Sequence, residues 1–105
     1  MKKCLFLIPT TFNNGDEIPV EVIDSVFDEL FRVFGAYSQD GITEGTWKLK
    51  DGTKVKDHSL KVWIVIEDDK VDLLKELIKK FARILKQEAI YFEVMDWSGE
   101  FLNRL

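Results

Sequence analysis

Cysteine and histidine are almost absent, since Cys4 and His58 are the only residues of their kinds. One cysteine cannot form a disulfide framework, and one thiol with one distant imidazole gives no ligand set for zinc or copper. The carboxylates do not follow the spacing of an EF-hand loop either. We therefore expect no metal site and no other cofactor, and a lone thiol in an apolar run fits a reducing compartment.

Long apolar runs and an excess of basic residues are also missing. No run approaches the ~20 apolar residues of a membrane-spanning helix, and the apolar part of "MKKCLFLIP" is too short for a signal peptide. Acidic residues outnumber basic ones by 19 to 15, which gives a net charge of −4. Since nucleic-acid affinity depends largely on Lys and Arg, we expect a cytoplasmic protein without nucleic-acid or membrane partners.

The remaining composition is that of a folded domain. Hydrophobic residues make up 46% of the 105 residues and charged residues 32%, which lies far from the composition of disordered chains. A chain of this length can bury a core of ordinary size without disulfides or metals. We expect one domain over residues 1–105.

The first half of the chain predicts a strand, a helix and the start of a hairpin. The apolar run "KCLFLI" reads as a buried strand that Pro9 ends, because proline lacks a ladder donor. Residues 19–34 carry apolar side chains at steps of three and four, which predicts an amphipathic helix that Gly35 caps. Alternation in "TWKLKDGTKVK" around Asp51 and Gly52 predicts a two-stranded ribbon with a tight turn.

The second half predicts a strand, a helix and a last strand. The stretch "SLKVWIVIED" alternates two apolar sets, and a bend or bulge is expected just before Leu60. Asp68 and Asp69 are expected to cap a helix that runs to about Leu85. The stretch "EAIYFEVMD" alternates again, and the apolar tail from Trp97 is expected to pack on another part of the protein.

The order strand, helix, strand, strand, helix, strand is the split βαβ arrangement, in which the first and third strands are central; these are the two most apolar strands here. The sequence resembles small ferredoxin-like proteins, and its hairpin "GITEGTWKLKDGTKVKDHSLKVWIVIED" is similar to that of uncharacterised small bacterial families. The resemblance implies an α+β fold: a four-stranded antiparallel sheet, two helices on one face, and a protruding hairpin. The loop "TTFNNG" lacks the arginine of acylphosphatase-like proteins, and RNA-recognition and Cys-x-x-Cys metal-chaperone motifs are absent too. Dimeric α+β-barrel proteins, small trimeric regulators and uncharacterised modules remain as relatives of this fold.

Two helices cover only one face of such a sheet. The other face is expected to carry Trp63, Val65, Tyr91 and Met95, together with one of two sets from the first strand, either Leu5 and Leu7 or Cys4, Phe6 and Ile8. A contiguous apolar patch of this kind marks an interface. We predict that a second copy covers it in a homodimer; the terminal segment and a ligand held between copies are the alternatives.

A catalytic site on this open face would be formed by four residues that are expected to converge: Glu44, Trp47, Tyr91 and Glu93. A carboxylate desolvated among aromatic rings acts as an acid or base, so Glu44, His58, Tyr91 and Glu93 are the candidate catalytic residues. Consecutive strand residues point to opposite faces, so Asp57, His58 and Ser59 cannot form a triad, and a turn is the expected role of His58. The candidate ligand or interface residues are Trp47, Trp63, Val65, Tyr91 and Met95.

Three functions fit this sequence. The first is a self-associating binding or regulatory module without catalysis, whose ligand is a small molecule or a protein. The second is a cofactor-independent enzyme of the dimeric α+β-barrel type, which acts on a small, partly apolar molecule. The third is an inhibitor or antitoxin-like protein with a basic partner. A closed cavity of several hundred Å³ with converging Glu, Tyr or His side chains would indicate the enzyme, and a filled core would indicate the module.

Overall fold

The fold is ferredoxin-like. The computed structural model describes residues 1–104, with the elements β1 (Lys2–Pro9), α1 (Val20–Phe34), β2 (Ser38–Lys48), β3 (Lys54–Ile66), η1 (Asp68–Lys70), α2 (Val71–Ile84) and β4 (Phe92–Asp96). The sheet has the order β2-β3-β1-β4, and each neighbouring pair is antiparallel. The two most apolar strands, β1 and β3, are therefore central, as the sequence predicts.

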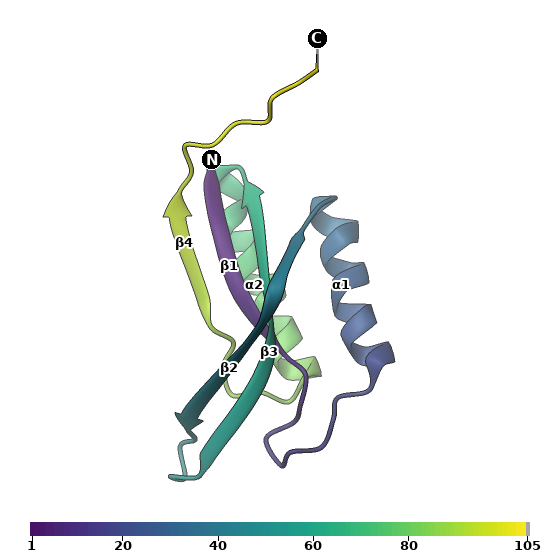
Figure 1. Cartoon of the computed structure of the whole chain (residues 1–105), viewed down its shortest axis with the longest axis vertical. Helices are drawn as coiled ribbons and strands as arrows, with labels where there is room; N and C mark the ends of the chain where they lie inside the picture. Colours follow the sequence, from purple (N-terminus) through teal and green to yellow (C-terminus); the bar gives the residue numbers. More distant parts are fainter. Residues whose placement is uncertain (105) are drawn as a thin grey trace.

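Both helices lie on one face of the sheet (Figure 1). Alternate residues of the central strands point at them, and this settles the choice between the two sets of β1: Cys4, Phe6 and Ile8 are fully buried beneath the helices. The core is completed by one side of β3 and by the apolar stripes of the helices, namely Val62, Ile64, Ile66, Val26, Phe27, Leu30, Leu74, Leu77, Ile78, Phe81 and Leu85. None of the helices within residues 1–104 has the length and hydropathy needed to cross a membrane.

The helix ends agree with the sequence only in part. Gly35 adopts a left-handed conformation after α1 and donates its backbone N–H to the carbonyl of Phe31, as a glycine cap should. The expected side-chain cap of α2 is wrong, because neither Asp68 nor Asp69 donates or accepts a capping hydrogen bond there. Both form the single turn η1, and the Asp68 carboxylate lies 3.2 Å from the terminal amine of Met1.

The β2–β3 hairpin extends beyond the rest of the sheet (Figure 1). Its tight turn holds Gly52 at φ +90°, and the Asp51 carboxylate accepts the backbone N–H of Thr53 at 2.8 Å. The irregularity expected in β3 before Leu60 lies instead in β2, where one extra residue shifts the register between Gln39 and Ile42. Gly41, at φ +85°, gives this bulge its conformation.

The terminal segment leaves the sheet rather than covering it (Figure 1). The Trp97 and Phe101 rings stack on each other with centroids 5.6 Å apart, and Phe101 and Leu102 are 76% and 83% exposed. Within the chain only the start of the tail is anchored: Trp97 is half-buried, and its backbone N–H donates to the carbonyl of Met1 at 3.3 Å. The prediction that the tail packs is therefore wrong within this chain for Phe101 and Leu102, and packing on a second chain stays a prediction. The hairpin and this segment project from opposite ends, which makes the longest dimension 53 Å.

Candidate functional site

The buried side of β3 changes along its length, and this change creates the site. In the sheet, the residues that face the helices are buried, such as Val62. In the hairpin, Val55, Asp57 and Ser59 are buried instead, and they belong to the opposite, open face of the sheet. Because bulges add twist and bend a strand, we attribute the change to the bulge at Gly41: the hairpin curls toward the open face and shields its lower end.

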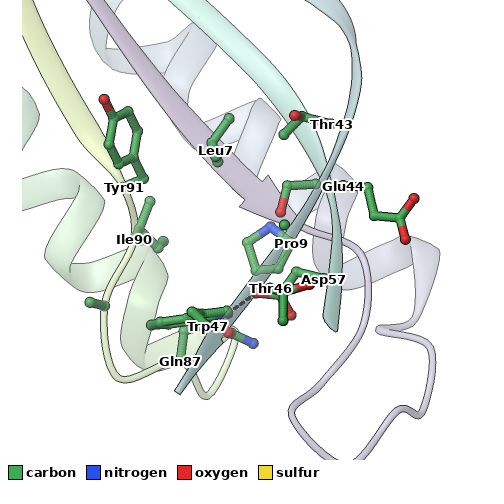
Figure 2. Close-up of a pocket in the computed structure, with 13 residues that line it drawn as sticks. Leu7, Pro9, Thr43, Glu44, Thr46, Trp47, Asp57, Gln87, Ile90 and Tyr91 are labelled. Atoms are coloured by element: carbon green, nitrogen blue, oxygen red, sulfur yellow. Dashed lines mark hydrogen bonds between the residues drawn. The ribbon is translucent and has the colours of Figure 1, made fainter. Parts of the chain in front are cut away.

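A cavity of about 410 Å³ occupies this shielded end. Its walls come from three parts of the chain that are distant in sequence: the end of β1, the hairpin, and the connection between α2 and β4 (Figure 2). The lining residues are Leu7, Pro9, Thr43, Glu44, Gly45, Thr46, Trp47, Asp57, Ser59, Gln87, Ala89, Ile90 and Tyr91. A mostly apolar cavity with a few polar groups is the usual form of a small-molecule site.

The Asp57 carboxylate is the buried charge of this cavity. Its side chain is on the same face as Trp47, two pairs further along the ladder, and the indole N–H of Trp47 donates to Asp57 Oδ2 (Figure 2). The residue is only 8% exposed, and Oδ1 accepts no hydrogen bond from any of residues 1–104. A buried carboxylate oxygen without a donor is costly, so this side chain is poorly satisfied by the fold itself.

Gly45 lies opposite Asp57 in the β2–β3 ladder and lines the same cavity. A Cβ built at this position would meet no atom within 4 Å, and the backbone does not have a positive φ. Neither close packing nor backbone conformation therefore requires glycine here. The missing side chain keeps the space beside Asp57 open.

Gln87 stabilises, through hydrogen bonds, the connection between α2 and β4 that forms one wall of the cavity. The side chain is 8% exposed, and its amide donates to the carbonyl of Leu85 at 3.0 Å and to that of Thr11 at 3.5 Å. Lys86, just before it, has a positive φ of 54°. The bond to Thr11 joins this connection to the loop after β1, so two otherwise separate loops support one wall.

Glu44 and His58 lie opposite each other in the ladder, on the side of the hairpin away from the cavity. Their side chains are 61% and 59% exposed, and the His58 Nε2 to Glu44 Oε2 distance is 4.0 Å. Figure 2 shows the Glu44 carboxylate directed away from the cavity. The expected turn role of His58 is wrong, because residues 57–59 lie within β3; Glu44 does not converge with Trp47 and Tyr91.

Tyr91 and Glu93 form a pair at the rim. Tyr91 lines the cavity, and its hydroxyl donates to the Glu93 carboxylate at 2.9 Å. This hydrogen bond raises the pKa of the Tyr91 hydroxyl above its usual value. The structure thus brings Trp47 and Tyr91 to one cavity, with Glu93 beside it.

The rest of the open face is mixed, with Leu5, Trp63 and Val65 half-buried and charged side chains among them. Register places Leu5 between Trp63 and Glu93, and Lys3 between Val65 and Met95. The Lys3 ammonium lies 4.5 Å from the centre of the Trp63 ring, which is a cation–π distance. Trp63, Val65 and Met95 therefore share a surface with each other, but none of them lines the cavity.

Two candidate residues escaped prediction: Asp57 and Gln87. Strand alternation could have indicated Asp57, because it occupies an odd-numbered position of β3 and therefore lies on the same face as Val55, Trp63 and Val65. An acidic residue on a predicted ribbon looks solvated unless the curl of the ribbon is known. Gln87 gave no such signal, since its role depends on a contact with a loop 76 residues away.

No family model matches the chain, and no curated protein matches it either. Among solved structures, a phage SAM lyase in complex with S-methyl-5′-thioadenosine is similar, with a TM-score of 0.71 at 17% identity over 90% of this chain and 80% of that one. The same lyase in its apo state has a TM-score of 0.69 at 15% identity, over 90% of this chain and 78% of that one. CutA1 from Pyrococcus horikoshii OT3 has a TM-score of 0.60 at 11% identity, over 96% of this chain and 87% of that one. At these identities the likeness concerns the fold.

Proposed function

We propose that this protein is a cytoplasmic, non-catalytic module that binds a small molecule in the hairpin cavity and associates with itself through the open sheet face. The observation that carries the binding proposal is Asp57, which is over nine-tenths buried at the cavity with one oxygen lacking a donor. Such a group lowers stability unless something compensates for it. Binding sites commonly keep groups of this kind at the expense of stability.

The dimensions of the cavity support the same proposal. Its volume of about 410 Å³ lies in the range of about 300–1,000 Å³ that is usual for ligand pockets. The likeness to a lyase solved with S-methyl-5′-thioadenosine makes that nucleoside a reasonable first probe. The single buried thiol, Cys4, supports the cytoplasmic location, because free thiols persist in reducing compartments.

The binding proposal is tested by two-dimensional NMR with a library of soluble fragments and S-methyl-5′-thioadenosine. Hits should shift the indole N–H signal of Trp47, identified by its loss in Trp47→Phe, and signals of residues 87–91. Gly45→Leu fills the cavity without a backbone clash and should abolish these shifts. Asp28→Asn, an exposed position on α1, should leave them unchanged.

Two results would overturn this proposal. One is a set of hits that scatter over the surface and avoid the cavity; the other is binding that survives Gly45→Leu undiminished.

The alternative of an enzyme acting on the same cavity is tested separately. Mass spectrometry after incubation of the protein with S-adenosylmethionine should show no product, and turnover abolished by Gly45→Leu would replace binding with catalysis.

A further inference from the structure

The charges around the hairpin cavity are unbalanced. The Asp57 carboxylate is buried at the cavity, and none of the thirteen described residues that line it is Lys, Arg or His; the Glu44 carboxylate points away from it. Basic residues of the same face are already engaged: the Lys61 ammonium lies 3.9 Å from the Asp40 carboxylate, and Lys3 lies over the Trp63 ring. The ion pairs formed within residues 1–104 do not include Asp57.

The hydroxyl side chains of Thr43, Thr46 and Ser59 also line the cavity, but none of them donates to Asp57. Trp47 provides its one indole N–H to Oδ2, and this uses the only hydrogen-bond donor that a Trp side chain has. The Tyr91 hydroxyl, at the other side of the cavity, donates to Glu93. Oδ1 is thus an acceptor whose partner has to come from outside residues 1–104.

The remaining walls favour a flat apolar body. Leu7, Pro9 and Ile90 present hydrocarbon, and the Trp47 indole adds an aromatic surface with a negative face (Figure 2). Aromatic faces attract cations, most strongly where water is excluded. An anionic ligand would meet Asp57 at short range with no cation to offset the repulsion.

From the sum of these features we propose that the hairpin cavity takes a small organic cation with a flat apolar body, for which Asp57 is the counter-ion and Trp47 the aromatic wall. This inference rests on the proposed binding function and names its ligand class. The cation supplies the positive charge, or an N–H donor, that Asp57 lacks. The body displaces water from the apolar walls, which is the favourable hydrophobic term.

The test uses three probes of similar shape and different charge: 2-phenylethylamine, 2-phenylethanol and phenylacetate. NMR titration at neutral pH follows the Trp47 indole N–H in the whole chain. We expect the protonated amine to bind about tenfold more tightly than the alcohol, as a desolvated ion pair with a cation–π contact allows, and phenylacetate to bind least. Asp57→Asn, which keeps the shape and the acceptor for Trp47, should reduce this preference to less than about threefold. Asp28→Asn should retain it.

Each other outcome has a defined meaning. Equal binding of amine and alcohol at the cavity would overturn the cation proposal and leave the binding function standing. A preference for the amine that persists in Asp57→Asn would also overturn it, because another group would then be the counter-ion. If no probe affects the cavity signals at millimolar concentration while fragments of the library do, the ligand class fails and the binding function stands; if neither the probes nor the library affect them, both fail.

Discussion

At the scale of single residues, Trp47 and Asp57 depend on each other. The indole N–H is the one donor that the Asp57 carboxylate has within the described chain, and Asp57 in turn holds the ring against the cavity. Removing one member of a buried hydrogen bond costs more than the bond contributes, since the other member is left unsatisfied. The two positions should therefore respond very differently to substitution.

Trp47→Phe should lower the free energy of unfolding by about 1–3 kcal/mol, because it leaves both carboxylate oxygens without a donor. Asp57→Asn should leave this free energy unchanged or raise it by about 1 kcal/mol, because a neutral amide is cheaper to bury. In the Asp57→Asn background, Trp47→Phe should cost clearly less than in the wild type. Urea denaturation of the wild type, the two single variants and the double variant measures the four free energies of unfolding. If Trp47→Phe lowers this free energy equally with Asp57 and with Asn at position 57, the two residues are not coupled.

At the scale of elements, the bulge in β2 decides where the hairpin points. One extra residue near Gly41 shifts the register, and beyond it the odd-numbered residues of β3 are buried on the open face. Gly41 and Gly45 both lie in β2, but glycine has a different role at each position. Gly41 provides a positive φ, and Gly45 provides empty space.

Gly41→Ala should destabilise the protein by about 1–2 kcal/mol, because a side chain at a φ of +85° is strained. Gly45→Ala is the matched control and should stabilise by about 0.5–1 kcal/mol, because it restricts the unfolded chain without a clash. Thermal unfolding compares the two variants. A destabilised Gly45→Ala would mean that the cavity wall is tighter than the structure indicates.

At the scale of the whole molecule, the open sheet face carries apolar side chains that the tail does not cover. Leu5, Trp63 and Val65 lie on it half-buried, and the terminal segment points away from it. Self-association through this face would remove it from water, and a typical interface of this kind buries about 800 Å² per partner. The proposal predicts an assembly that depends on Val65 and its neighbours.

Val65→Lys should weaken self-association at least about tenfold, because it replaces an apolar side chain of the face with a second ammonium directly opposite Lys3. Phe31→Lys, at a residue 59% exposed on α1, is the control and should leave the assembly intact. Sedimentation equilibrium over a wide concentration range measures both. A wild-type protein that stays monomeric at the highest concentrations would exclude the interface.

Local patterns were sufficient for much of the fold. Alternation, helical periodicity and turn residues act over a few positions, so they predicted β1, the Gly35 end of α1, the Asp51-Gly52 turn and the strand order of the sheet. They failed where the outcome depended on a partner strand: the bulge was expected near Leu60 in β3 and lies in β2. They failed again for His58, whose neighbours suggested a turn and whose ladder partner, Glu44, keeps it in a strand.

The sequence by itself determined the elements, their order and the two faces of the sheet, because side-chain periodicity sorts residues by burial before any tertiary contact forms. Only the tertiary structure decided that the hairpin curls over the open face, that Asp57 is buried there beside Trp47, and that Gln87 closes the wall. Each of these facts depends on segments far apart in the chain. Their approach is set by the twist and packing of the whole sheet, which no short stretch of sequence encodes.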